Sequence, residues 1–274
     1  MKLKLTILCA VLLFNFSDLS AQKLPAEFFE GIKSFASNRI QAKKDMLATI
    51  AKVPNFHGGY HFLGVIYSEA GQQDSAIYYL DKAVALNTEN LQKTKEMSLA
   101  RLIEAHTYKH DFEKAFKIGL AAYELFPENT SIATNFKDAC VWSYYLKYEG
   151  LDKGYLSPNL KENYGVTSIA QEYLIIRKLI YKGERVQSTR QTMQTIENAS
   201  YDVHKLVTPA DSTEKILKFK LNWDLNTEFG GKAFPKDPII ANRKNPIYER
   251  LGAILANEYR SDLKTELAKL NNEK

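Results

Sequence analysis

Residues 57–83 read HGGYHFLGVIYSEAGQQDSAIYYLDKA, and their pattern indicates the fold expected for the first half of the chain. Its apolar side chains recur at helical spacing in two segments, which Gly71 separates. Gly64 in the first segment and Ala76 in the second are small, so two helices could approach closely there. The stretch therefore predicts a helical hairpin, two antiparallel helices joined by a tight turn, with Asp74 capping the second helix. One hairpin cannot bury its apolar face alone and needs neighbours.

The segments on both sides of this hairpin repeat its pattern. Ala42, Ala76 and Ala115 occupy the same place on the second helix of three successive units. The second interval is longer than the first, and its additional residues are placed around Leu91–Lys95, where they are expected to lengthen the first helix of the third unit. A fourth helix over residues 131–148 is expected to end the array.

This pattern resembles the tetratricopeptide repeat, a helix-turn-helix unit of about 34 residues. The characteristic small and apolar places of the family are filled by Leu63, Gly64, Tyr67, Ala76, Leu80 and Ala83. Two positions depart from the family, because Tyr60 stands where Trp is usual and Thr88 replaces the terminal Pro. The resemblance implies a mainly α fold, with an antiparallel helix-hairpin array over residues 22–148.

The resemblance also implies a concave groove built from the first helix of each hairpin. Eight positions are expected to face it: His61, Val65, Ser68, Glu69, Ala100, Glu104, Thr107 and Tyr108. Family members that bind chaperones grip a C-terminal carboxylate with Lys and Asn at such places. Neither residue type occurs in this set, and Glu104 would repel a carboxylate, which argues against that one ligand. A solvated inner face without a ligand is the alternative.

Residues 149–274 carry no family resemblance and predict a small α+β segment. Apolar and polar residues alternate over 217–225, which indicates a strand with one buried face. Residues 201–207 are expected to pair with this strand across a turn at 209–213. The segment therefore predicts a small antiparallel sheet.

Two further parts of this segment contain long apolar patterns. Residues 173–181 are β-branched and aromatic, which predicts a strand in a hairpin with 185–193, although a helix beginning at Ser168 also fits the spacing. An apolar stripe over 247–270 follows Pro246 and predicts a C-terminal helix, which we expect to cover the sheet.

Residues 1–21 are typical of an export signal. A basic start at Met1–Lys4 precedes a short apolar run, Leu5–Phe16, which is too short to span a bilayer. Cleavage is expected after Ala21, and the Ala21-Gln22 junction resembles signal sequences of the Bacteroidetes. We therefore expect export to the periplasm or cell surface, with no transmembrane segment after cleavage; an uncleaved anchor is the alternative.

The composition excludes one class of partner. The 274 residues are 45% hydrophobic and 25% charged, as in soluble globular proteins, and the net charge is +5. Lys and Arg are scattered among Asp and Glu without a block of like charge. Nucleic acid is therefore not expected as a partner.

Candidate residues for catalysis or metal binding are few. Two histidine pairs have the i, i+4 spacing that places both rings on one side of a helix: His57 with His61, and His106 with His110. Neither pair has the Glu of a zinc protease, and packing or helix-end roles explain all four. Gly230-Gly231-Lys232 lacks the remaining residues of a phosphate loop, and no GxSxG motif occurs. We therefore expect no catalytic, cofactor-binding or metal site.

The function favoured by these patterns is non-catalytic. An exported repeat array predicts the binding of a protein or peptide in an assembly of the cell envelope. The alternative is that the C-terminal segment binds a small ligand or glycan, or is an unrecognised enzyme, with the array as a docking arm. A pocket among Tyr181, Trp223 and Phe229 would favour this alternative.

Overall fold

The structure is a computed structural model of the chain. It describes residues 24–148, 163–166, 169–181, 184–208, 214–221, 241–257 and 262–272. Several predicted features lie outside these ranges: the export signal at 1–21, the turn at 209–213, Trp223, Phe229 and Gly230-Gly231-Lys232.

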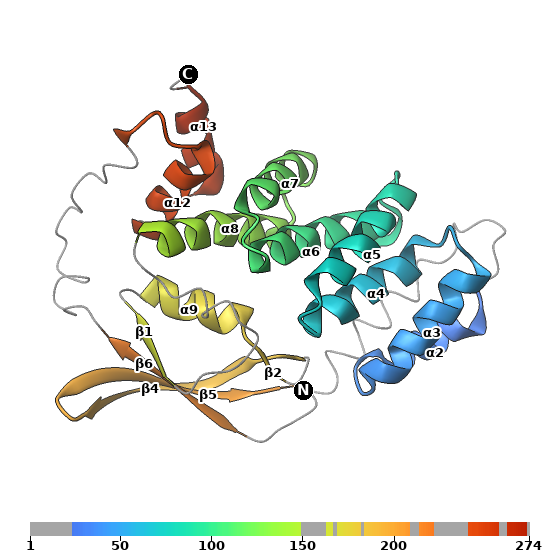
Figure 1. The fold of residues 1–274 in the computed structure, drawn as a ribbon, viewed down its shortest axis with the longest axis horizontal. Coiled ribbons are helices and arrows are strands. Elements are labelled where there is room, and N and C mark those ends of the chain that lie inside the picture. The colour runs from blue at the N-terminus through green and yellow to red at the C-terminus, as the bar shows by residue number, and fades with distance from the viewer. Residues whose placement is uncertain are drawn as a thin grey trace.

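Residues 24–148 form an array of helical hairpins. Its helices are α2 (Ala26–Phe35), α3 (Arg39–Lys52), α4 (His57–Glu69), α5 (Gln73–Leu86), α6 (Thr94–Tyr108), α7 (Phe112–Leu125) and α8 (Thr130–Tyr148). Consecutive helices pack as pairs, α2 with α3, α4 with α5 and α6 with α7, and the pairs stack side by side (Figure 1). The prediction of a mainly α, helix-hairpin fold is confirmed.

The small residues of the central hairpin allow its two helices to pack closely. A Cβ atom added to Gly64 would lie 2.5 Å from Leu80 Cγ, so only glycine lets α5 approach α4 this closely. Ala76 is fully buried at the same contact. Gly71 has a φ of 74°, the left-handed conformation that glycine adopts without strain at a helix end.

Two local predictions for the array are wrong. The residue before α5 is Gln72, and Asp74 lies inside the first turn, where its carboxylate pairs with Lys109 on the neighbouring α6–α7 connection. Of the inserted residues Leu91–Lys95, the first three form a separate 3-10 turn, η2, and only Thr94 and Lys95 belong to α6. The Asn87 side chain holds this turn by accepting from Leu91 N at 2.7 Å and donating to Leu91 O at 3.0 Å.

The last helix of the array receives a partner from the C-terminus. α12 (Ile247–Asn257) packs against α8 about as extensively as α3 packs against α2. A Cβ atom on Gly252 would collide with the carbonyl of Cys140, so the backbones of α12 and α8 meet directly. α12 therefore occupies the place of the second helix of a fourth hairpin.

A four-stranded mixed sheet follows the array. Its strands are β1 (Asn163–Val166), β4 (Gln187–Ile196), β5 (Ala199–Val207) and β6 (Lys215–Leu221), in the order β1-β6-β5-β4. β4–β5 and β5–β6 are antiparallel, with Tyr201 opposite Lys220, which confirms the predicted pairing of 201–207 with the strand at 217. β1 adds a parallel edge beside β6. β2 (Ile180–Tyr181) and β3 (Glu184–Arg185) form a separate two-stranded pair.

The predicted strand at 173–181 is wrong. Most of it belongs to α9 (Ile169–Lys178), and only Ile180 and Tyr181 are extended. The adjacent residues Leu174 and Ile175 are both buried, which a half-exposed strand does not allow, whereas one face of a helix does. Packing onto the sheet and α8 outweighs the β propensity of the side chains. The neighbouring prediction, a strand within 185–193, is confirmed by β4.

The C-terminal apolar stripe forms two helices, α12 and α13 (Leu263–Asn272), instead of one. The expectation that it covers the sheet is wrong, because α12 packs on α8 while α9 lies over the sheet (Figure 1). Trp142 of α8, Leu174 of α9, Phe219 of β6 and Leu251 of α12 belong to one hydrophobic core. The array and the sheet thus share a core.

In the part of the chain that the structure describes, no helix combines the length and the apolar character that crossing a bilayer requires.

Candidate functional site

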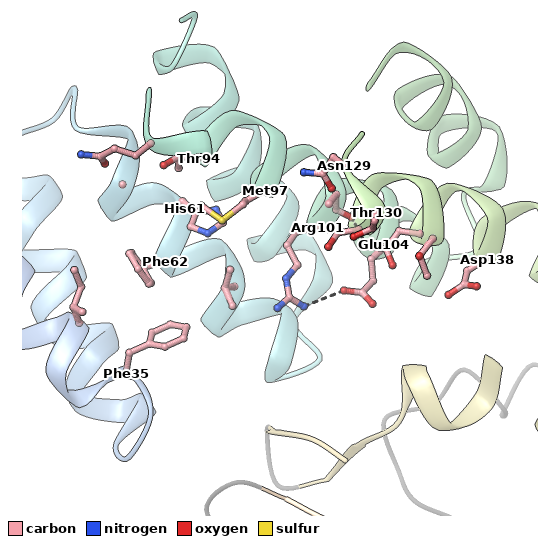
Figure 2. A pocket seen from close by; sticks show the side chains of 18 of the residues that line it. Phe35, His61, Phe62, Thr94, Met97, Arg101, Glu104, Asn129, Thr130 and Asp138 are labelled. Atoms are coloured by element: carbon pink, nitrogen blue, oxygen red, sulfur yellow. Dashed lines mark hydrogen bonds and ion pairs between the residues drawn. The ribbon is translucent and has the colours of Figure 1, made fainter. Parts of the chain in front are cut away.

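The first helices of the hairpins, α2, α4 and α6, together with α8, surround a groove of about 600 Å³ (Figure 2). Half of the predicted groove residues line it: His61, Val65, Ala100 and Glu104. The groove lies on the side of the array that the repeat pattern predicted.

The other four predicted residues do not line the groove. Ser68 and Thr107 are buried in the array, and Thr107 donates to the carbonyl of Ile103 at 2.8 Å. Tyr108 packs against the core shared with the sheet. Glu69 is buried in an ion-pair network with two arginines. These positions lie about one helical turn beyond the groove residues Val65 and Glu104 on α4 and α6, where the helices face the interior.

One end of the groove is apolar. Phe35 of α2 and Phe62 of α4 meet edge to face with ring centroids 5.0 Å apart, and Figure 2 shows both rings at this end. Ile32 and Met97 add aliphatic surface. The contribution of α2 to the groove was not predicted, because the expected groove residues all lie on the two hairpins that follow.

The other end of the groove is polar and lies at the start of α8 (Figure 2). Asn129 caps this helix, since its Oδ1 accepts from Ile132 N at 3.0 Å, and its Nδ2 donates to Glu96 Oε2 at 3.0 Å. Asn135 Nδ2 donates to the carbonyl of Ala100 at 2.9 Å. These amides link α8 to α6, so the polar end is rigid.

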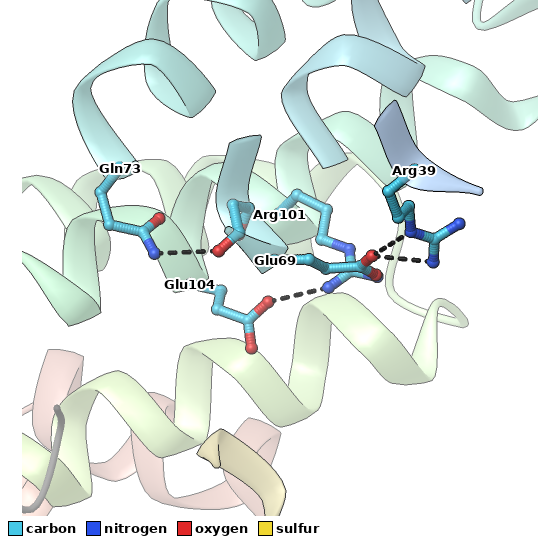
Figure 3. Close-up of polar contacts among 6 residues, drawn as sticks. Arg39, Glu69, Gln73, Arg101 and Glu104 are labelled. Carbon is cyan, nitrogen blue, oxygen red and sulfur yellow. Dashed lines mark hydrogen bonds and ion pairs between the residues drawn. The ribbon is translucent and has the colours of Figure 1, made fainter. Parts of the chain in front are cut away.

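A chain of alternating charges, Arg39, Glu69, Arg101 and Glu104, reaches the groove at its last two members (Figure 3). Arg39 Nη2 lies 2.8 Å from Glu69 Oε2, and Arg101 Nη2 lies 3.7 Å from Glu69 Oε1. Arg101 Nη1 donates to Glu104 Oε2 at 3.1 Å. Glu104 therefore presents a neutralised carboxylate to the groove, and two cations balance two anions.

His61 is an uncharged groove residue. Its Nδ1 lies 2.9 Å from Ser98 Oγ, and the ring is buried. Burial, with the nearby Arg101 and then His57, lowers the pKa of His61 to about 3. Burial also lowers the pKa of His57. His61 can thus donate or accept a hydrogen bond near neutral pH without carrying charge.

The second predicted histidine pair has separate partners. His106 Nδ1 lies 3.4 Å from Asp111 Oδ2, and the pKa of His106 is lowered because burial outweighs the opposing Asp111. The His110 ring stacks on Phe112 with centroids 5.9 Å apart. Both histidines are engaged at the α6–α7 connection, away from the groove lining.

A second polar cluster lies between α9 and β5. Glu172, Asp202 and His204 each offer a ligand atom within 4.8 Å of the others. His204 Nε2 lies 2.5 Å from Glu172 Oε1, and both side chains are buried. Burial raises the pKa of Glu172, the hydrogen bond from His204 opposes this rise, and the charge of Asp202 adds to it.

This cluster was not predicted from the sequence. Glu172 stands just before the run predicted as a strand, and a strand there would not have faced His204. The one usable sign was the alternation that places Asp202 and His204 on the same face of their strand.

No model of a known protein family, no curated protein and no solved structure matches the chain.

Proposed function

We propose that the chain is an exported, non-catalytic scaffold of the tetratricopeptide type, which binds an extended segment of a partner protein in the groove between α2, α4, α6 and α8. The N-terminal export pattern and the repeat spacing support this proposal from the sequence. The observation that carries it is the groove itself, which has an aromatic end, a polar end and a charge-balanced middle.

The chemistry of the groove favours a particular class of segment. Phe35, Phe62 and Met97 would receive an apolar side chain of the partner. The amides and hydroxyls at the start of α8 would bind the backbone or a polar side chain a few residues away. Because Arg101 is paired with Glu69 and Glu104, the middle favours neither a strongly acidic nor a strongly basic segment.

The proposal is tested by selecting peptides from a random library on the immobilised wild-type chain and measuring their affinities by fluorescence anisotropy. Met97→Glu places a charge at the apolar end and is expected to weaken binding at least about ten-fold, because a buried apolar contact is worth about 1.5–3 kcal/mol. The matched control is Tyr78→Glu, which changes an aromatic residue that is 56% exposed on α5, outside the groove lining.

Equal affinities in both variants would contradict the proposal, as would a failure to enrich any peptide. Circular dichroism of each variant shows whether the array is still folded.

A further inference from the structure

We propose that Glu172, Asp202 and His204 bind one divalent transition-metal ion of the Zn²⁺ class between α9 and β5. This site is separate from the groove and independent of the proposed function.

The donor set suits such an ion. One ligand atom from each residue lies within 4.8 Å of the others, so small side-chain movements would bring all three onto one cation. Imidazole nitrogen favours Zn²⁺ and its neighbours over Mg²⁺ and Ca²⁺, which prefer oxygen ligands alone. Glu172 and His204 are 0% exposed and Asp202 is 9% exposed, so the cluster opens towards solvent at Asp202.

The orientation of His204 allows its Nε2 to present a lone pair to the cluster. Its Nδ1 lies 2.9 Å from Ser188 Oγ, which can accept the Nδ1 proton. In that tautomer Nε2 is unprotonated, and Nε2 is the atom beside Glu172 Oε1. A lone pair facing a carboxylate oxygen at 2.5 Å requires a cation between the two atoms, and a metal ion can supply it. In the other tautomer, Nε2–H donates to Glu172 Oε1 and the Ser188 hydroxyl donates to Nδ1.

The charge around the two carboxylates favours the metal ion. Among the described residues, neither Glu172 nor Asp202 forms an ion pair with Lys or Arg. Within the same residues, Glu172 Oε2 is buried and has no hydrogen-bond partner. A single proton on Nε2 would leave this oxygen unsatisfied, at a cost of about 1–3 kcal/mol, whereas a metal ion can bind it directly.

Neighbouring side chains hold the three ligands in place. Gln191 Nε2 donates to Asp202 Oδ2 at 2.5 Å, and Tyr173 OH donates to Gln191 Oε1 at 2.7 Å. Ser188 orients the His204 ring. Hydrogen bonds of this kind fix metal ligands and raise their basicity.

Ser188, His204 and Glu172 also have the connectivity of a hydrolase triad, with a hydroxyl, an imidazole and a carboxylate in contact. That arrangement assigns no role to Asp202 and leaves Glu172 Oε2 unsatisfied. Metal binding accounts for both, and for this reason we prefer it.

The experiment uses the full purified chain after removal of metals with EDTA. Titration with Zn²⁺ is followed by calorimetry, and Co²⁺ is added to a second sample to record the visible spectrum of the bound ion. Wild type is expected to bind one Zn²⁺ per chain and to give a Co²⁺ spectrum with nitrogen and oxygen ligands.

Two conservative variants remove ligands without opening a cavity, Glu172→Gln and Asp202→Asn, and each is expected to lower the Zn²⁺ affinity by more than about ten-fold. Ser188→Ala, which removes only the support of His204, is expected to lower it by about ten-fold. His106→Gln is the matched control, since His106 also lies beside a carboxylate but belongs to no group of three close ligand atoms among the described residues, and it should bind as wild type.

Absence of Zn²⁺ binding by wild type, or equal binding by wild type, Glu172→Gln and Asp202→Asn, would overturn the proposal. It would also be overturned if the metal-free chain hydrolysed p-nitrophenyl acetate and lost this activity in Ser188→Ala, because the cluster would then be a nucleophilic triad. Circular dichroism of the two ligand variants confirms that they are folded.

Discussion

The groove and the α9–β5 cluster both bury carboxylates, but they neutralise them differently. Beside the groove, Glu69 lies between the guanidinium groups of Arg39 and Arg101, so the array supplies its own countercharge. In the cluster, Glu172 contacts His204, and within the described residues it has no ion pair with Lys or Arg. The first set of charges is therefore part of the scaffold, whereas the second lacks a Lys or Arg countercharge among the described residues, which is where we propose a bound cation.

The largest expected effect on the free energy of unfolding concerns the ion pairs of Glu69. Glu69→Gln removes the anion between two arginines and is expected to lower the free energy of unfolding by about 3 kcal/mol, because a broken buried ion pair leaves uncompensated charge. Urea denaturation measures the change. The control, Glu30→Gln, breaks an exposed pair with Lys33 and should cost less than about 1 kcal/mol. Equal losses in the two variants would show that the network is not structural.

A slightly smaller loss of stability is expected when the pH is lowered and His61 is protonated. The folded pKa of His61 is about 3, below its ordinary value of 6.5, so the unfolded chain binds the proton more readily. The stability from neutral His61 is fully present above pH 6.5 and declines as the pH falls towards 3. Wild type should lose about 2–3 kcal/mol more than His61→Gln between pH 6.5 and about pH 4.5. Parallel pH curves for the two proteins, from urea denaturation, would contradict this.

The smallest change in the free energy of unfolding is expected for Glu172→Gln in the metal-free protein. Glu172→Gln keeps the shape of the side chain, removes an uncompensated charge and offers an amide donor to His204 Nε2. In EDTA the free energy of unfolding should therefore change by less than about 1 kcal/mol. A loss as large as that of Glu69→Gln would mean that the two regions hold their carboxylates in the same way. Adding Zn²⁺ should then stabilise wild type but not the variant.

The array was predictable because its contacts are close in sequence. Gly64, Ala76 and Leu80 lie within one hairpin, and each helix packs on the next, so a local pattern is enough to indicate the fold. The groove was only half predictable. His61 and Val65 do line it, but the contribution of Phe35 depends on how α2 stacks against α4, which no local pattern records.

The second half was less predictable because its contacts are distant. Residues 173–181 have side chains that suit a strand or a helix, and burial of both Leu174 and Ile175 selects the helix α9. Asp202 and His204 lie on one strand, yet they form a cluster only because α9 delivers Glu172 from an earlier part of the chain.

The helical hairpins of residues 24–148 and the pairing of 201–207 with the strand at 217–221 follow from the sequence, since alternation and helical spacing are local properties. Three features become visible only in the folded chain: α12 completes the last hairpin on α8, α9 covers the sheet, and Glu172 contacts His204. Each of these features depends on close packing between segments far apart in the chain. The need for a small residue at Gly252, for example, arises only because the Cys140 carbonyl of α8 packs against it.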